Sequence, residues 1–405
     1  LDFKFEGSPD YASQMNVELK GDKITIPGKI SPTVIDAINL FVKGTGQNHT
    51  IRGGSSMALG GRHYKMEIDA VGGLNKQNQW KGILNVLDIS GAFNLKLQNR
   101  MTLEAGSEKV VLGAARWSAM GGSLNLDSFI WDKKNGITTK GRASNLAVSE
   151  LHNFYTPPVE HNLVLSGDWD LSYSRNMRGY INIRRQSGDI VLPYHRQMLG
   201  LGNLTLNTQF QNGRIDSKLD GVTAYGNVNG NVVINQQFGN DISLAPINGH
   251  IRISAYDLQR FRNFIPIGQT LKGSLLGDAT ISGRVGSPQL NGTLNGDNLY
   301  YRNQEVGVIL SNGSLRSRLI GQRWHIDSLR FQRGGTVTLS GDVNLNTGSP
   351  DVDVTALFDH YITLDRPSRR LVLSGDSKLV YTVAKGVMLT GTLKADSGRK
   401  KKKKS

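Results

Sequence analysis

Leu165-Ser-Gly-Asp-Trp-Asp-Leu-Ser-Tyr173 is the stretch that decides the fold class of this chain. At the two-residue period of a β-strand its leucines, glycine and aromatic residues share one face, and its serines and aspartates share the other. If the strand runs through, Gly167 lies on the apolar face, where the missing side chain lets the strand bend inward. If it does not, Ser-Gly-Asp is a hairpin turn. Apolar alternation resumes in phase after the glycine, which favours the bend.

The Leu-x-Gly-Asp element recurs along the chain, and Leu373-Ser-Gly-Asp-Ser-Lys-Leu-Val-Tyr381 is a long near-copy. Such repetition indicates an array in which each unit packs on its neighbours, so a long chain need not divide into conventional domains. We expect one array over residues 1–398, with sub-units near 1–145, 146–256 and 257–398, and a disordered basic tail over 399–405. The six copies begin at Leu19, Leu165, Leu275, Leu294, Leu339 and Leu373.

Short alternating segments separated by turn residues fill the rest of the chain and predict roughly thirty strands. In one continuous sheet, at ~4.8 Å per strand, these would extend on the order of 140 Å. Twisted sheets rarely exceed ~10 strands without curling or splitting, so a long curved single layer and stacked sandwiches are both open. Three segments read instead as short amphipathic helices: 32–42, entered at Pro32 with Ser31 as N-cap, then 145–154 and 257–264.

Composition narrows the class of protein. The 405 residues include 48 Gly and 11 Pro and lack Cys, so disulfides are excluded. Of the formal net charge of +15, six charges belong to Arg399 and the lysines at 400–404, which leaves +9 for the body. No apolar run approaches the ~20 residues of a membrane-spanning helix, and no signal peptide opens the chain. Residue 1 already stands in an alternating pattern, so we expect a piece of a longer protein whose membrane anchor lies elsewhere.

Motifs for catalysis or cofactor binding are missing from the sequence. There is no Gly-x-Ser-x-Gly elbow, phosphate loop or complete dinucleotide glycine pattern. No two of the eight histidines stand three to five residues apart, as zinc ligands often do, although a distant pair can still meet in space. Tyr300-Tyr-Arg302 and Tyr194-His-Arg196 could contact nucleic acid, but such clusters are more often strand-face packing. We therefore expect a protein that is not an enzyme and needs no cofactor or metal.

The alternating apolar face is the candidate site. In a sandwich or closed solenoid it forms a dry core; in an open curved sheet it lines a groove. Exposed apolar patches beyond a few hundred Å² usually have a partner, and a long groove suits lipid acyl chains. The predicted lining residues are Leu165, Trp169, Leu171, Leu204, Leu206, Ile251, Ile253, Ile281, Val337, Leu339, Leu371, Leu373 and Leu379. The predicted bend glycines are Gly167, Gly277, Gly341 and Gly375.

Several segments, taken in order, resemble the TamB family of Gram-negative bacteria, in the AsmA-like group. They are Trp80–Ile89, Phe93–Leu97, Ala115–Leu124 and Ser144–Leu151. The run Gly273–Leu294, with its Gly-x-x-x-Pro-x-Leu-x-Gly spacing, is similar to the family's repeat, and Ser328–Gly341 fits the strand pair that follows. The resemblance covers most of residues 1–398 and departs from the family at the terminal lysines.

The resemblance implies a β-taco, a long sheet folded into a U with an apolar interior. It implies a periplasmic protein held in the inner membrane by an N-terminal helix. It also implies transport of phospholipid between inner and outer membranes, and help for outer-membrane protein assembly with the Omp85-type barrel TamA. Two alternatives stay open. One is a scaffold or chaperone that offers sheet edges to unfolded outer-membrane strands. The other is a closed β-solenoid adhesin.

Overall fold

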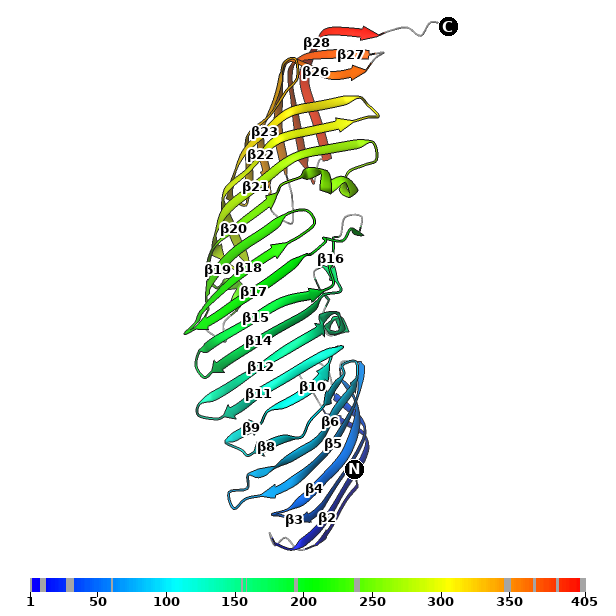
Figure 1. The fold of residues 1–405 in the computed structure, drawn as a ribbon, viewed down its shortest axis with the longest axis vertical. Helices are drawn as coiled ribbons and strands as arrows, with labels where there is room; N and C mark the ends of the chain where they lie inside the picture. Colours follow the sequence, from blue (N-terminus) through cyan, green and yellow to red (C-terminus); the bar gives the residue numbers. More distant parts are fainter. Residues whose placement is uncertain are drawn as a thin grey trace, which may run out of the picture. The chain divides into compact units, whose positions relative to one another are not determined.

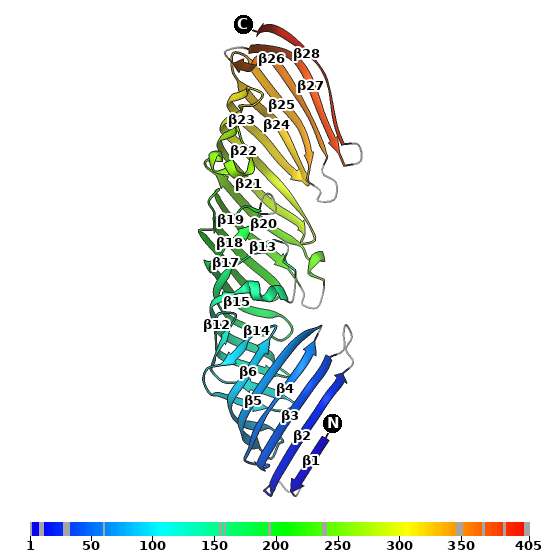
Figure 2. The ribbon, with the colours of Figure 1, turned by 90° about the vertical axis from the view of Figure 1, so that its right-hand side faces the viewer.

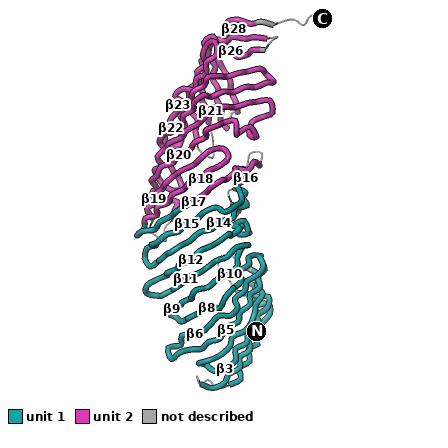
Figure 3. The backbone as a smooth tube through the Cα atoms, viewed as in Figure 1, with its two compact units in different colours: residues 1–189, 207–213 teal, residues 190–206, 214–405 magenta. Residues whose placement is uncertain are grey.

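The computed structural model describes residues 2–7, 12–26, 33–59, 61–153, 156–157, 159–192, 196–236, 241–345, 351–366, 369–383 and 386–400. Strands dominate these residues, and 26 of the strands belong to one antiparallel sheet (Figures 1 and 2). The prediction of an all-β fold built from a long antiparallel sheet is confirmed. The chain divides into two compact units, residues 1–189 with 207–213, and residues 190–206 with 214–405 (Figure 3). The predicted division into three sub-units stays a prediction.

Unit 1 is an antiparallel series of hairpins. Its elements are β1 (Asp2–Gly7), β2 (Gln14–Ile26), β3 (Thr33–Thr45), β4 (His49–Leu59), β5 (Arg62–Leu74), β6 (Trp80–Gly91), β7 (Leu95–Leu97), β8 (Met101–Ala105), β9 (Lys109–Leu112), β10 (Ala115–Ala119), β11 (Gly122–Asp132), β12 (Gly136–Ala147), the 3-10 helix η1 (Val148–Asn153), β13 (Glu160–His161), β14 (Val164–Tyr173) and β15 (Met177–Ser187). Strands β1 to β6 pair in sequence order. The short strands β7 and β8 then lie end to end along β6, β10 and β9 follow them, and β11, β12, β14 and β15 complete the order.

Unit 2 continues the same kind of meander. Strand β17 (Asn203–Gln211) is shared, and its residues 203–206 belong to unit 2. The other elements of unit 2 are β16 (Ile190–Val191), β18 (Arg214–Val222), β19 (Asn227–Asn235), η3 (Ile242–Leu244), β20 (Ile247–Ala255), η4 (Leu258–Phe264), β21 (Gln269–Arg284), β22 (Ser287–Asn303), β23 (Val308–Gly321), β24 (Arg323–Gln332), β25 (Thr336–Asn344), β26 (Val352–Arg366), β27 (Arg369–Thr382) and β28 (Gly386–Lys400). From β18 to β28 each strand pairs with the next. At one end β26 also reaches β23, through the pair Val308 and Leu364.

All six Leu-x-Gly-Asp elements lie inside strands, in β2, β14, β21, β22, β25 and β27. The strand therefore runs through the glycine, and the hairpin-turn alternative is wrong. The glycine is also opposite an apolar neighbour; Gly277, for instance, pairs with Ile253 on one side and Leu294 on the other. Directly opposite residues share a face, so the glycine belongs to the apolar face, as the alternation predicts.

One predicted helix is wrong and two are shorter than expected. Residues 33–45 form strand β3; Ser31 and Pro32 lie outside the described residues. A register shift between Ile35 and Ala37 changes the side on which the later residues point. Of the described residues within 145–154, those of η1 alone are helical, because the residues before Val148 belong to β12. Over 257–264, η4 begins after Asp257, whose carboxylate accepts a hydrogen bond from the Gln259 N–H. β28 ends at Lys400, and the rest of the predicted basic tail, 401–405, lies outside the described residues, so the tail stays a prediction.

Each unit has one apolar cluster built mainly from neighbouring strands. In unit 1 it includes Leu84, Met101 and Trp117, which are 3%, 2% and 6% exposed. In unit 2 it includes Val337 and Tyr361, which are 2% and 0% exposed. The Tyr361 hydroxyl donates to the Ile309 carbonyl at 3.1 Å and so ties β26 to β23. Side chains of the apolar face thus pack against one another at the centre of each unit.

Candidate apolar binding face

Exposure of the apolar face rises steadily from the core of unit 2 to its last strands. Beside Val337, which is buried, Phe358 is half-buried and pairs with Gly375 of β27. Farther along, Leu379 of β27 is 38% exposed, and its β28 partner Leu389 is 70% exposed. Strands β27 and β28 curve along their length (Figure 2), and several side chains that they carry on this face are exposed. We call β26–β28 on this side the open face; its most exposed members are Leu379, Val387, Leu389 and Leu393.

A second exposed stretch of the same kind lies at β1 in unit 1. Phe3 and Phe5 are 63% and 44% exposed. Phe5 heads a row of directly opposite residues that runs through Val17, Val42 and Ile51 to the buried Ala70. The row shows that the exposed phenylalanines and the packed cluster belong to one face.

The opposite face of the sheet is polar and carries the aspartates of the repeat. Asp278 accepts hydrogen bonds from Arg252 at 2.6 Å and from His250 at 2.6 Å. The Arg252 hydrogen bonds, followed by that of His250, hold the pKa of the Asp278 carboxyl below its usual range. Asp342 is 2.9 Å from His325 in the same way. Leucine and glycine on one side and paired aspartate on the other make the repeat two-faced.

Bending of the strands depends on bulges as well as on glycine. The register of β12 shifts between Ala143 and Leu146, where Asn145 has φ +55°. A bulge of this kind kinks the strand and increases its twist. The Asn145 N–H donates to the Ser166 hydroxyl of the repeat at 2.9 Å. The near-copy repeats this arrangement: His360, φ +50°, donates its N–H to the Ser374 hydroxyl at 3.0 Å. The serine of Leu-Ser-Gly-Asp therefore holds the bulge of the neighbouring strand, a role that the sequence alone did not reveal.

The four predicted bend glycines differ in whether a side chain could be added at their position. Gly341 and Gly375 have φ of +151° and +123°, which side-chain-bearing residues rarely adopt. Gly167 has an ordinary φ, but a Cβ there would collide with the Asn182 carbonyl oxygen. Gly277 has an ordinary φ, and a Cβ would meet its nearest neighbour, Leu294, at 3.5 Å. Only the first two require glycine for their backbone conformation.

Other glycines on the apolar face make room for aromatic rings of the same strand or of a neighbouring strand. Trp80 lies over Gly72 and Gly82, where added Cβ atoms would come within 2.7 and 2.5 Å of its ring. Its Nε1–H donates to His49 Nε2 at 3.0 Å, while His49 Nδ1 donates to the Thr45 carbonyl at 2.9 Å. Trp169 covers Gly141 in the same manner. Aromatic side chains thus fill part of the space beside the glycines.

The predicted lining residues all have side chains on this apolar side, but they differ in access. Val337 is a buried core residue, so only its neighbours present solvent-accessible apolar surface at that place. Ile253 and Leu379 are exposed, at 51% and 38%. Contact with lipid stays a prediction for the whole set. The half-buried members are Leu165, Trp169, Leu171, Leu204, Leu206, Ile251, Ile281, Leu339, Leu371 and Leu373.

Sequence reasoning missed several exposed positions of the face, namely Phe3, Phe5, Val387, Leu389 and Leu393. Their alternation, Phe3-Lys-Phe5 and Val387-Met-Leu389, was the signal that could have found them. The alternation placed these residues on strands. It could not predict their exposure, because exposure depends on how many neighbouring strands pack around the face in the folded sheet.

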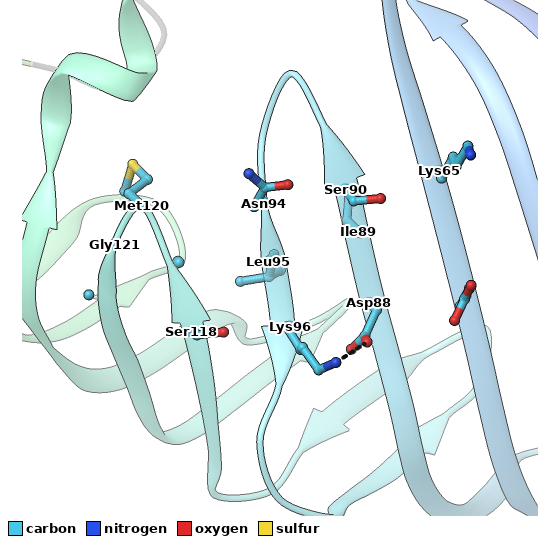
Figure 4. A pocket seen from close by; sticks show the side chains of 13 residues that line it. Lys65, Asp88, Ile89, Ser90, Asn94, Leu95, Lys96, Ser118, Met120 and Gly121 are labelled. Carbon is cyan, nitrogen blue, oxygen red and sulfur yellow. Dashed lines mark ion pairs between the residues drawn. The ribbon is translucent and has the colours of Figure 1, made fainter.

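Polar pockets and histidines in the described residues do not assemble a metal site. A cavity of about 580 Å³ in unit 1 lies on the polar side, where Lys96 is 3.3 Å from Asp88 (Figure 4). His152 and His161 do meet, with 3.1 Å between their Nε2 atoms. Among the described residues no group of three or more His, Asp or Glu side chains could hold a metal ion.

Comparisons with known proteins identify the family. The family model described as TamB, N-terminal domain, matches residues 3–295. No curated protein and no solved structure matches the chain. In the part of the chain that the structure describes, no helix is long and apolar enough to cross a membrane. A match over more than half of the chain, on a long antiparallel sheet with one apolar face, shows that this chain belongs to the TamB family.

Proposed function

We propose that this chain is a wall segment of a lipid conduit, in which the apolar face binds the acyl chains of phospholipids. The open face carries the proposal, because Leu389 at 70% exposed is continuous by register with the buried Val337 region. Burial of apolar surface gains about 0.8 kcal/mol per methylene, so about ten methylenes would contribute about 8 kcal/mol before ordering costs. The polar face with its paired aspartates would stay in water. No step of this role calls for catalysis.

The full-length protein, on this proposal, is anchored in the inner membrane, crosses the periplasm and works with the outer-membrane barrel TamA. Membership of the TamB family supports this placement. Phospholipid would then move between the two membranes along the U-shaped groove implied by the family.

Photocrosslinking at adjacent positions tests the lipid contact. Leu389 and Met388 are both apolar and exposed, at 70% and 48%, but consecutive strand residues point to opposite faces. A photoreactive residue at 389 should capture phospholipid in cells, whereas one at 388 should capture far less. Position 206, on the same apolar side, should also give an adduct, and 205 should not. Equal capture at 389 and 388, and at 206 and 205, would contradict the proposal.

A charge on the apolar face gives an independent functional test. Leu206→Asp should impair lipid transport while leaving circular dichroism unchanged, because an unpaired charge is costly beside acyl chains. Native mass spectrometry of the purified chain should show copurifying phospholipid. A protein free of lipid would support the closed-core alternative.

Assembly of outer-membrane proteins by strand addition is the second candidate function. β28 has exposed side chains on both faces, with Val387 at 71% and Met388 at 48%, and it is registered with β27. An incoming strand could extend such an edge through main-chain hydrogen bonds. If this function dominates, Thr390→Pro should reduce outer-membrane protein assembly more than Leu206→Asp does. If the conduit dominates, the order should be reversed.

A further inference from the structure

The connections along one side of unit 1 form a row of hairpin tips. The tips join β5 to β6, β8 to β9, β11 to β12 and β14 to β15, and the hairpins are neighbours because β6 pairs with β8, β9 with β11 and β12 with β14. Two strands separate each tip from the next, which corresponds to about 10 Å. Figure 1 shows the β8–β9, β11–β12 and β14–β15 tips following one another along one edge of the unit.

These tips are strongly basic. They carry six cations, Lys76, Lys109, Lys133, Lys134, Arg175 and Arg178, and two anions, Glu108 and Asp132; Lys81 and Glu104, equally close to the tips, form an ion pair with each other. We call the six cations the basic rim. Lys133 is 2.7 Å from Glu108, and Arg178 donates to Asn212 at 2.7 Å. Lys76, Lys134 and Arg175 are exposed and form no ion pair with another described residue. The connections at the opposite strand ends, from β4 to β16, carry Glu150, Glu160 and Asp189, and β5 begins there with Arg62, so the charge is one-sided.

A band of aromatic side chains lies just inside the basic rim on the apolar face. Trp80 is directly opposite Ala105, Ala105 opposite Val110, and Val110 opposite Trp131. The row then continues through Ile137 to Tyr173. Trp80, Trp131 and Tyr173 are all half-buried.

Proteins that cross a membrane–water interface show the same order of side chains. The cations lie outermost, followed by tryptophan and tyrosine, and then by aliphatic side chains. There the indole and phenol rings sit at the level of the headgroups, and Lys and Arg contact phosphates. Trp80 itself packs against the apolar cluster of unit 1, which joins the aromatic band to the core. The rim, the band and the core therefore match the three layers of a phospholipid from phosphate to tail.

We infer that the basic rim binds the phosphate headgroups of anionic phospholipids whose acyl chains lie on the apolar face of unit 1. This inference rests on the proposed lipid function and adds the class of lipid and the side of unit 1 at which the headgroup lies. The arrangement favours lipid over nucleic acid, because the aromatic rings point to the apolar face and are half-buried, whereas base stacking needs open ring faces. A free phosphate would use the cations but not the aromatic band.

Paired binding measurements on the full chain test the inference. The probes are phosphatidylglycerol and phosphatidylcholine with identical acyl chains, one of them fluorescent, displaced by the other at low ionic strength. We expect tighter binding of phosphatidylglycerol. In the variant Lys76→Gln/Lys134→Gln/Arg175→Gln, the ratio of phosphatidylglycerol affinity to phosphatidylcholine affinity should fall at least tenfold. Each cation near an anionic lipid surface contributes roughly fivefold to affinity. Binding of phosphatidylcholine should be unchanged.

A matched variant removes the same charge from the polar face. Lys65, Arg142 and Arg184 are exposed on strands β5, β12 and β15 and make no ion pair with a described residue. Lys65→Gln/Arg142→Gln/Arg184→Gln should keep the full preference. If it loses as much as the rim variant, net charge explains the effect and the inference is overturned. The single reversal Lys134→Glu, at an exposed tip, repeats the test with minimal risk to folding.

The remaining outcomes separate the two proposals. If the unmodified chain binds both lipids equally and the rim variant does not alter this, the headgroup inference fails while the lipid function stands. If neither lipid binds, the proposed function fails with it. Glycerol phosphate or a single-stranded oligonucleotide that binds as tightly as phosphatidylglycerol would overturn the assignment to a lipid headgroup.

Discussion

Ser166→Ala tests how the repeat shapes the sheet. Ser166 is 4% exposed, and its hydroxyl accepts the N–H of Asn145, the left-handed residue of the β12 bulge. Removing the hydroxyl takes away the acceptor of this part-buried hydrogen bond, which costs about 0.5–1.5 kcal/mol. Ser340 occupies the same position in another copy of the repeat but is exposed, so Ser340→Ala should change stability by less than about 0.5 kcal/mol.

Amide hydrogen exchange measures this cost locally, which suits a repeat protein whose parts open separately. A loss of about 0.5–1.5 kcal/mol corresponds to a roughly 2- to 12-fold faster exchange of the Asn145 amide if the bulge opens locally. Ser374→Ala should speed exchange of the His360 amide in the same direction but by less, because that hydrogen bond is exposed. Unchanged exchange at Asn145 in Ser166→Ala, or an equal effect of Ser340→Ala, would refute the role of the serine as the acceptor that holds the bulge.

Three further changes have defined outcomes. Gly375→Ala should destabilise β27–β28 by about 1–3 kcal/mol because its φ of +123° suits only glycine, whereas Gly277→Ala should be nearly neutral; urea denaturation followed by hydrogen exchange compares them. Tyr361→Phe should cost about 0.5–1.5 kcal/mol, since it removes the hydrogen bond from the Tyr361 hydroxyl to the Ile309 carbonyl, and a lower Tm checks this. Burial, followed by the charge of His152, lowers the pKa of His161, so the unfolded chain binds the proton more readily and stability near η1 should fall as pH drops below about 6.5; His161→Gln should flatten this dependence in pH-resolved hydrogen exchange.

Local alternation predicted the strands because side-chain direction on a strand depends only on residue parity. The in-phase pattern around Gly167 correctly placed the glycine inside β14 and Asp168 on the polar side. The same reasoning failed over 32–42, where apolar residues occur on both faces. Phe41 points to the polar side of β3, beneath the Lys20 ammonium at 5.7 Å, and the register shift after Ile35 breaks the parity. A mixed pattern of this kind imitates a helical period.

The sequence by itself determined the fold class, the two-faced character of the repeat and the family resemblance, because each depends on residues close together in the chain. The tertiary structure alone decided which apolar residues are buried and which are open: Val337 and Leu389 have the same alternating pattern but are 2% and 70% exposed. It alone brought the Ser166 hydroxyl to Asn145 and set the hairpin tips of unit 1 in one basic row. Strand pairing is the physical reason, since register and neighbour number join residues far apart in sequence, and no local period encodes them.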